Sequence, residues 1–553
     1  MWKRGKISFI VAFLEISITI VMVLTSEYEP SADAADSMHS LSPPLGGLAP
    51  DRNPSVRHLR HFSSHHLLPL LGMGFMYAGL PTSGSLSGLA FHLMVFTFAC
   101  QWSLVLPRIL TTSWPKVQEE QQQRSTIGLE QLIRSSRTAT MVCITNGLLH
   151  RKLGPIQSLI LACVQVPLIS IIFNTLHYQW KVVDTGDAIG GYVFAIYYGV
   201  GIAYSRSIMI KWRNRSHRNR PSSTIISKKV PKRTSSPSML YPVQSSGNSG
   251  SVAILPARQL ATNEYHNCMS TMMGIIVMYS LFPSVISSHI QGDRQHRLAI
   301  TSYLSITGST LSAYTFSALM DRHDRLSVDH IRCGVLSGGI VMAGIGDHMI
   351  YPYTALLIGL AIGTISCANQ VYFGPHLASK VGLYDDMGLH SSIGIPALFS
   401  GLLSAGLALI ADESDYGFTL YELFPARAPL ANSSELDEIH SLLERIQPGD
   451  GRSAFTQSAI QFAAIMATLM AAMITGMASG VLLMIPALEP IYEDDCVDKH
   501  CHQHRTSHFH DSLYWTATRV ANGSQSSGEI DSEDGGNNNN DRNDTCGQTM
   551  LHD

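Results

Sequence analysis

Long runs of apolar residues recur along this 553-residue chain and constrain its fold more than any other feature. A bilayer core of about 30 Å needs about 20 mostly apolar helical residues to cross it. Twelve runs of that length lie near residues 7–25, 66–81, 86–107, 128–150, 155–176, 186–205, 264–286, 297–320, 330–350, 352–373, 392–411 and 456–485. The sequence therefore predicts an all-α membrane protein with about 12 transmembrane helices.

Composition agrees with this prediction, because only 14% of the residues are charged, against roughly 25% in an average soluble protein. The fourth run is the least apolar, since it carries Arg134 and Arg137. A nucleophile elbow, a phosphate-binding loop and a paired-carboxylate signature are all missing from the sequence. We therefore expect no enzyme, no cofactor and no nucleic-acid partner.

The charges that flank the runs predict their orientation. Lys3, Arg4 and Lys6 precede the first run, and Glu27 and Glu29 follow it, which places the N-terminus in the cytoplasm by the positive-inside rule. The same run also fits a cleaved signal peptide, because small residues follow it. Its length and an internal glutamate favour a retained helix.

The linker at residues 206–262 supports this orientation, because it holds eleven basic residues and neither Asp nor Glu. After six crossings it falls on the cytoplasmic side, and twelve crossings return the C-terminus there as well. Its Ser, Pro and Arg content is typical of a disordered segment, with an anionic-lipid site as the alternative. We expect a multi-pass protein of the plasma membrane.

The resulting domain organisation has six parts. We expect a first transmembrane helix at 1–25, an extracellular loop at 26–65, helices 2–6 at 66–205, the basic cytoplasmic linker at 206–262, helices 7–12 at 264–485 with an extracellular loop at 412–455, and a largely disordered cytoplasmic tail at 486–553.

Two local motifs stand outside the apolar runs. Asn432 begins an Asn-Ser-Ser sequon in the outer loop, where glycosylation enzymes could reach it. The tail offers candidate ligands for zinc or copper, although the spacing matches no closed structural motif and a disordered His-rich tract is the favoured interpretation. The candidate metal ligands are Cys496, His500, Cys501, His502 and His504.

Several motifs resemble those of a known family. GDRQHRLAITSYLSI begins at Gly292, and LSGG, PYTALLIG, VYFGPHL and GIP come after it, up to Pro396, at that family's spacings, so the alignment needs no gap. KLGPIQ at 152–157, KVVDTGDAIGGYVFAIYYG at 181–199 and FHDSLYW at 509–515 extend the match. The chain thus resembles the Rhesus (Rh) glycoprotein branch of the ammonium transporter superfamily.

This resemblance implies inverted five-helix repeats and a trimer, formed with identical chains or with other Rh chains. Each protomer would carry its own narrow pore for ammonia or ammonium, lined by two facing histidines behind stacked phenylalanines. Parting ammonia from its proton lowers the cost of crossing the bilayer.

This sequence departs from that pattern at the pore. The family's two pore histidines fall on Tyr192 and Ile393, and its gate phenylalanines fall on Arg137 and Val285. The nearby tryptophan falls on Phe282. At two positions where the family has an acidic residue, this chain also has one, namely Asp184 and Asp347. The resemblance therefore implies a retained scaffold with altered conduction chemistry.

Two residues leave alternatives open. His390 lies three residues before Ile393 on roughly the same helical face, so it either points into the pore or packs elsewhere. Arg137 either repels ammonium, by about 4 kcal/mol at 4 Å and an effective dielectric of about 20, or pairs with an internal acid. For His92 and His348 we expect packing or hydrogen bonding between helices.

These observations favour an electroneutral ammonia channel or transporter. A channel for neutral carbon dioxide is a variant of that reading. The rival is a pore-inactive subunit that anchors cytoplasmic partners through the linker and tail. Loss of both pore histidines fits this rival, whereas the retained glycine motifs and Asp184 fit transport.

We predict that Asn432→Gln abolishes any N-glycan shift of this protein on a gel. Asn522, in a second sequon, lies in the tail that we place in the cytoplasm. A glycan shift that survives Asn432→Gln and disappears with Asn522→Gln would place the tail outside.

Overall fold

Helices occupy all twelve predicted apolar runs in the computed structural model, which confirms the all-α prediction. Seven of the described helices are long and apolar enough to cross a membrane. For the other runs the crossing stays a prediction. The structure describes residues 6–28, 54–80, 85–113, 126–150, 152–218, 257–288, 290, 292–320, 326–383, 385, 387–431, 433–443 and 446–485.

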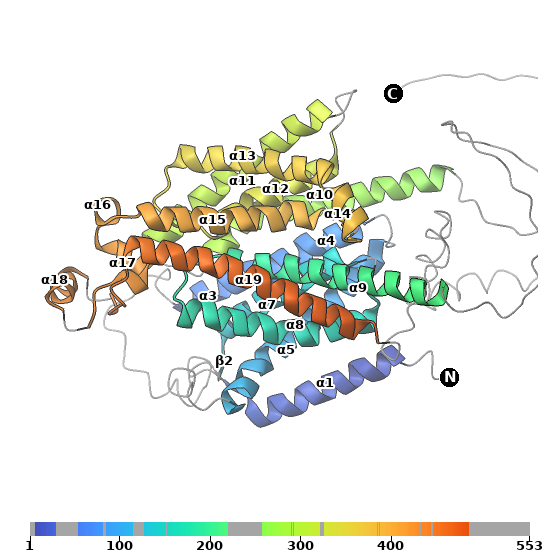
Figure 1. Cartoon of the computed structure of the whole chain (residues 1–553), viewed down its shortest axis with the longest axis horizontal. Helices are drawn as coiled ribbons and strands as arrows, with labels where there is room; N and C mark the ends of the chain where they lie inside the picture. Colours follow the sequence, from blue (N-terminus) through green and yellow to red (C-terminus); the bar gives the residue numbers. More distant parts are fainter. Residues whose placement is uncertain are drawn as a thin grey trace, which may run out of the picture. The chain divides into compact units, whose positions relative to one another are not determined.

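Two groups of helices lie side by side (Figure 1). The first group contains α1 (Lys6–Thr25), α3 (Pro54–Leu67), η2 (Leu68–Met73), α4 (Gly74–Ala78), α5 (Ser85–Ser113), α7 (Leu129–Leu148), α8 (Pro155–Asn174), η5 (Thr175–Gln179), η6 (Ala188–Val193) and α9 (Phe194–Arg218). The second group contains α10 (Ala257–Ser287), α11 (Asp293–Met320), α12 (Val328–Ala343), α13 (Pro352–Tyr372), α14 (Gly374–Lys380), η7 (His390–Gly394) and α15 (Ile395–Ile410). The last long helix, α19 (Ala454–Leu483), packs against both α9 and α15 and so joins the groups.

The first helix is attached to the rest of the bundle by polar contacts. Gln101 on α5 donates a hydrogen bond of 3.1 Å to the Glu15 carboxylate of α1. A two-residue parallel pair joins β1 (Glu27–Tyr28) to β2 (Thr126–Ile127), just before α7. That α1 is retained in the mature protein stays a prediction.

Small residues allow α11, α12 and α13 to approach closely. A Cβ atom at Gly359 of α13 would fall on the backbone of Ser305 in α11. At Gly308 of α11, a Cβ would lie 2.7 Å from the Leu356 carbonyl oxygen. Within a lipid bilayer the hydrophobic effect does not drive helices together. Van der Waals contact between closely packed helices therefore holds them together.

The sixth and eleventh runs begin with π-helical turns that carboxylates cap from the preceding loop. The Asp184 carboxylate accepts a hydrogen bond of 2.9 Å from the Ile189 backbone N–H at the start of η6. Asp385 accepts one of 2.7 Å from the backbone N–H of His390, which begins η7. Both contacts satisfy N–H groups that a helix start leaves unpaired. Each half of the chain thus has one π-helical turn whose first N–H groups are bonded to a carboxylate from the preceding loop.

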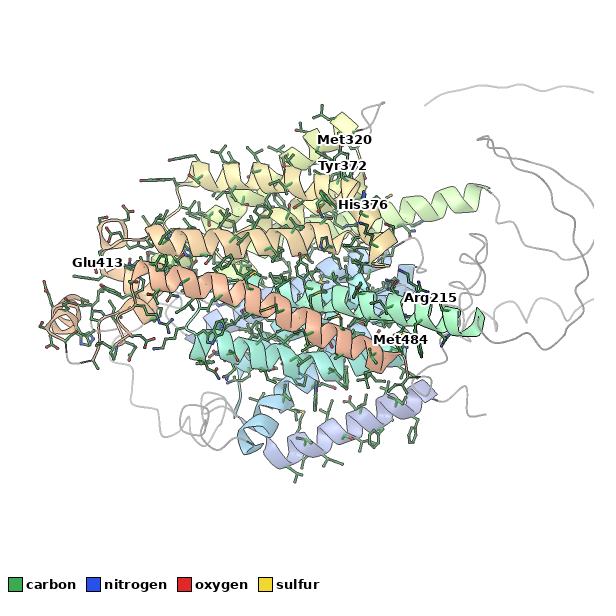
Figure 2. The ribbon with its side chains drawn as sticks, viewed as in Figure 1. Arg215, Met320, Tyr372, His376, Glu413 and Met484 are labelled. Carbon is green, nitrogen blue, oxygen red and sulfur yellow. The ribbon has the colours of Figure 1, made fainter. Side chains whose placement is uncertain are left out.

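A cap of short helices covers one end of the bundle. The outer cap, residues 412–453, contains α16 (Glu413–Tyr416), η8 (Gly417–Thr419), α17 (Leu420–Leu423), η9 (Pro425–Arg427) and α18 (Ser434–Leu442). Figure 2 shows Glu413 at this end of the bundle and Arg215 and Met484 at the opposite end. The cap corresponds to the predicted extracellular loop, so we call its end of the bundle the outer end.

Charged side chains attach the outer cap to the stretch that precedes η6. Lys181 Nζ lies 2.7 Å from the Asp450 carboxylate, and Arg452 donates a 2.7 Å hydrogen bond to the Trp180 carbonyl oxygen. The hydrogen bond from Lys181 lowers the pKa of Asp450, so this attachment persists through the ordinary titration range of an aspartate and is lost only as pH falls through the lowered pKa. From the helix bundle, Gln461 of α19 donates a hydrogen bond of 2.9 Å to the Val183 carbonyl oxygen.

Two predicted boundaries differ from the structure. The predicted loop at 26–65 is helical from Pro54, because α3 continues directly into η2 and α4. The ninth run was expected to reach residue 350, yet α12 ends at Ala343. The Ala343 carbonyl oxygen accepts a hydrogen bond of 2.7 Å from the Gly186 N–H, so a contact with the loop before η6 replaces a further helical turn.

We predict that Gly359→Val destabilises the protein by about 3 kcal/mol or prevents folding, because the new side chain cannot avoid the Ser305 backbone. Gly406→Val on α15 is the matched control, since nothing lies within 4 Å of a Cβ at that position. Thermal unfolding of the detergent-solubilised protein measures both. Equal melting temperatures for the two variants would contradict the packing described for α11 and α13.

Candidate functional site

The carboxylate of Asp184 is held by backbone N–H groups rather than by a basic side chain. Its Oδ2 atom accepts hydrogen bonds from Ile189 at 2.9 Å and Gly190 at 2.8 Å, while Oδ1 has no hydrogen-bond partner in the described part of the chain. The side chain is almost fully buried. Backbone N–H groups at a helix start stabilise a negative charge, so Asp184 orients η6.

Asp347 is the centre of a buried ion-pair network at the outer end. Its carboxylate accepts hydrogen bonds from Arg294 at 2.6 Å and from the Thr185 hydroxyl at 2.8 Å, and the His348 Nδ1 atom lies 3.2 Å away. Arg297 donates 2.8 Å to the Asp347 carbonyl oxygen. Asp347 therefore joins α11 and the end of α12 to the loop before η6, which is a structural role.

Arg137 of α7 forms an ion pair with Asp187. Asp187 has a left-handed backbone (φ 60°), and its carbonyl oxygen accepts hydrogen bonds from Gly191 and Tyr192 at 3.0 and 2.9 Å. Asp is among the non-glycine residues that tolerate this conformation. The loop geometry thus aims the Asp187 carboxylate at Arg137, and the pair carries no net charge.

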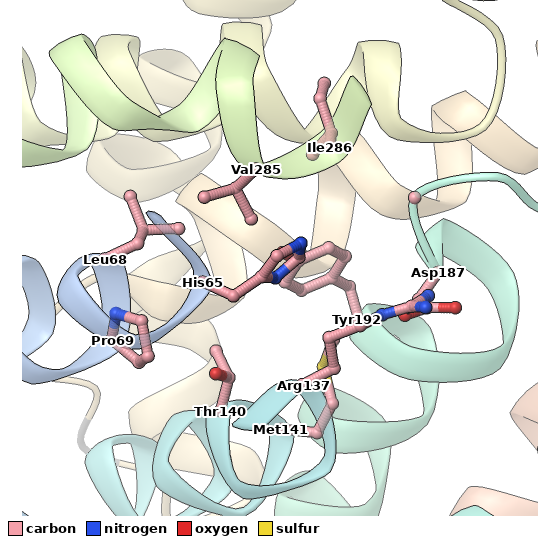
Figure 3. A pocket seen from close by; sticks show the side chains of 11 residues that line it. His65, Leu68, Pro69, Arg137, Thr140, Met141, Asp187, Tyr192, Val285 and Ile286 are labelled. Atoms are coloured by element: carbon pink, nitrogen blue, oxygen red, sulfur yellow. The ribbon is translucent and has the colours of Figure 1, made fainter. Parts of the chain in front are cut away.

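A cavity of about 30 Å³ lies beside this ion pair (Figure 3). Such a volume holds about one or two molecules the size of water. Its walls come from α3 and η2, from α7, from η6 and the loop before it, and from the end of α10. The lining residues are His65, Leu68, Pro69, Arg137, Thr140, Met141, Gly186, Asp187, Tyr192, Val285 and Ile286.

Three of the residues that the sequence singled out meet at this cavity, namely Arg137, Tyr192 and Val285. Phe282 lies one turn before Val285 on α10 and is buried against Gly339 of α12. The cavity therefore lies where the resemblance places the gate and the first pore histidine.

The remaining predicted residues lie elsewhere. Ile393 is buried in η7, which packs against η6. His390 does not line the cavity, and its ring meets Tyr197 edge to face at 5.9 Å between centroids. His92 of α5 bonds to the Pro69 carbonyl oxygen of η2 at 2.8 Å, so it joins two helices as expected. His348 contacts the adjacent Asp347, and its ring meets Phe424 of the outer cap edge to face at 5.6 Å between centroids.

Sequence reasoning missed His65, Thr140 and Asp187 as cavity residues. His65 falls in the range expected to be an extracellular loop, and no periodicity marks it. Asp187 is part of the KVVDTGDAIGG motif, so its position three residues after Asp184 was the available signal. The alternative in which Arg137 pairs with an internal acid is the arrangement observed, with Asp187 as that acid.

The predicted metal ligands Cys496, His500, Cys501, His502 and His504 lie outside the described residues, and so does Asn432. Within the part of the chain that the structure describes, no group of three or more His, Cys, Asp or Glu side chains could hold a metal ion. The adjacent Ser433 caps α18 by accepting a hydrogen bond from the Leu436 N–H at 3.2 Å, and α18 begins at Ser434, the last residue of the sequon.

Comparisons with known proteins agree with the sequence resemblance. A model of the Ammonium Transporter Family matches residues 254–509. The ammonium transporter Rh type B of Sus scrofa is 28% identical over 69% of this chain and 72% of its own length. The Rh type C transporter of the same organism is 25% identical over 93% of this chain and 94% of its own length.

Two solved structures share the fold. Rh50 of Nitrosomonas europaea is 18% identical, with a TM-score of 0.52 over 85% of this chain and 98% of that one. Mep2 of Saccharomyces cerevisiae is 12% identical, with a TM-score of 0.50 over 78% of this chain and 86% of that one.

We predict that Asp187→Asn destabilises the protein by about 3 kcal/mol, because it leaves the mostly buried Arg137 without a counter-charge. Arg137→Gln alone should also destabilise, and the double variant should recover about 2 kcal/mol relative to the sum of the single variants. Asparagine is chosen because it accepts the left-handed backbone of position 187.

Arg134→Gln provides the control, since its pair with Glu130 is half exposed and should contribute less than about 1 kcal/mol. The measurement is thermal or denaturant unfolding in detergent. Strictly additive effects of the Arg137 and Asp187 changes would show that the two charges are not coupled.

Proposed function

This chain belongs to the ammonium transporter family as an Rh-type member, and on that premise we propose that it carries ammonia across a membrane through a pore in each protomer. The transported form is neutral ammonia, so the flux is electroneutral. We further propose a trimer in the plasma membrane, with both termini in the cytoplasm. The observation that carries the proposal is the charge balance at the outer cavity.

Two of the three buried carboxylates in this region are paired with an arginine, since Asp187 pairs with Arg137 and Asp347 with Arg294. Asp184 accepts backbone N–H groups through Oδ2 and has no partner at Oδ1, but it does not line the cavity. At the cavity, a permeating ammonium ion would have to compete with Arg137 for Asp187. Because removing one partner from a buried pair is costly, the described residues favour a neutral solute.

The cost of removing the solute from water also favours neutral ammonia over ammonium. Moving an unpaired cation from water into an apolar environment costs far more than moving a neutral polar molecule. Ammonia loses only its hydrogen bonds to water, at a cost of a few kcal/mol. The Tyr192 hydroxyl and the Thr140 hydroxyl at the cavity offer partial replacement, whereas Ile393, at the family's second histidine position, offers none.

A pore-inactive structural subunit is the second candidate. The Arg137–Asp187 pair lies at the position expected for the gate, and both imidazoles of the family pattern are replaced. An assembly role would require only the retained helix packing. Conduction of carbon dioxide is a variant of the first proposal, because a neutral gas needs no hydrogen-bonding group in the pore.

We predict that a host lacking its own ammonium transporters takes up ammonium when it produces this protein, without a matching membrane current. At fixed total concentration, uptake should rise with external pH, about tenfold per pH unit while ammonium predominates over ammonia. Flux and current are recorded in parallel, in cells with and without the protein.

A variant with the family's groups restored sharpens this experiment. Tyr192→His, Ile393→His and Arg137→Phe are combined with Asp187→Asn, because removing Arg137 alone would leave a buried negative charge. Methylammonium uptake should increase in this variant. An ammonium-dependent inward current in the unmodified protein would refute electroneutral transport, and absence of flux in both forms at the cell surface would favour the structural subunit.

A further inference from the structure

Helix α9 extends past its neighbour α19 at the end of the bundle opposite the outer cap, which we call the inner end (Figure 1). The two helices pack side by side, and a Cβ atom at Gly480 of α19 would fall on Ser205 of α9. Shortly after that contact α19 ends at Leu483, whereas α9 continues to Arg218. The final turns of α9 therefore project beyond α19.

The length of the helix places these final turns at the level of the lipid headgroups. Because η6 continues directly into α9, one helix runs from Ala188 to Arg218. About 20 helical residues cross the hydrocarbon core of a bilayer, and counted from Ala188 that length ends near Ile208. The end of α19 indicates the same level, since Leu483 follows its contact with α9 by about one turn. Residues 209–218 thus lie in the headgroup layer and beyond it.

One side of this segment carries exposed side chains of two kinds. Trp212 follows Ile208 by four residues and Arg215 follows Lys211 by four, so the four residues share one side of the helix. All four are exposed, and Trp212 is 68% exposed. We call them the α9 stripe. Ile208 lies at the edge of the hydrocarbon core, and Trp212 lies at the depth where tryptophan is enriched in membrane proteins.

The two basic side chains of the α9 stripe are not compensated by acidic groups. Neither Lys211 nor Arg215 has an ion-pair partner among the residues that the structure describes. The sequence also contains no Asp or Glu between Asp187 and Glu264. The α9 stripe therefore presents two positive charges to the membrane surface.

We propose that the α9 stripe binds an anionic phospholipid, whose headgroup contacts Lys211 and Arg215 and whose acyl chains pack along Ile208. Guanidinium and ammonium groups are strong donors to phosphate oxygens, and basic residues beside a membrane attract anionic lipids. A free phosphate ion would leave Ile208 and Trp212 exposed to water, whereas a phospholipid covers both. This inference does not depend on which solute the protein transports.

Tryptophan quenching tests the site in the purified full-length protein. The protein is placed in phosphatidylcholine vesicles that contain a minor fraction of phosphatidylserine with brominated acyl chains, which quench tryptophan fluorescence on contact. The signal of Trp212 is the difference between each protein and the same protein with Trp212→Phe.

Brominated phosphatidylserine should bind beside Trp212 about 20-fold more strongly than brominated phosphatidylcholine at the same fraction, since each basic side chain contributes about fivefold. Lys211→Gln and Arg215→Gln should each lower this preference about fivefold, and Lys211→Arg should retain it. Arg134→Gln on α7 is the matched control, because it removes the same charge from another exposed side chain, which pairs with Glu130. It should leave the preference unchanged.

Three results would overturn the proposal. The first is equal quenching by the two brominated lipids in the unmodified protein. The second is a preference for phosphatidylserine that survives the double change Lys211→Gln and Arg215→Gln. The third is a preference that is lost in sodium phosphate but not in sodium chloride of the same ionic strength, which would show that the α9 stripe takes free phosphate rather than a lipid.

Discussion

The position of the loop before η6 determines the outer half of this molecule. Asp184 caps η6 through two backbone N–H groups, Thr185 bonds to Asp347, and Gly186 bonds to the end of α12. The Asp187 side chain then pairs with Arg137. A four-residue stretch thereby fixes the start of the sixth run, the end of the ninth and the wall of the cavity.

Much of the fold could be predicted from the sequence, because apolar runs of bilayer length and flanking charges depend on local composition. Even the run that carries Arg134 and Arg137 is helical. The early end of α12 could not be predicted, since it depends on a hydrogen bond to Gly186, more than 150 residues away. The helical start of α3 was missed for a similar reason, because its histidine-rich sequence lacks an apolar pattern.

The candidate site was only partly predictable. The resemblance to the family assigned Arg137, Tyr192 and Val285 to the gate and the first pore position. In the structure these three residues line one cavity. The same spacing could not reveal that Asp187 compensates Arg137, because the pairing depends on a left-handed backbone. His65 was beyond reach, since its contact with Ser288 joins helices separated by most of the first half of the chain.

The outer cap also has an evolutionary consequence. Lys181 and Trp180, which precede the cavity loop, are held by Asp450 and Arg452 of the cap. Insertions within the cap that keep these anchor residues in place would leave the cavity undisturbed, so homologous chains are free to diversify its exposed surface. Loss of Arg452 or Asp450 would instead remove a contact with the residues that precede the cavity loop. The exposed surface of the cap is thus independent of the cavity, whereas its base contacts the residues that precede the cavity loop.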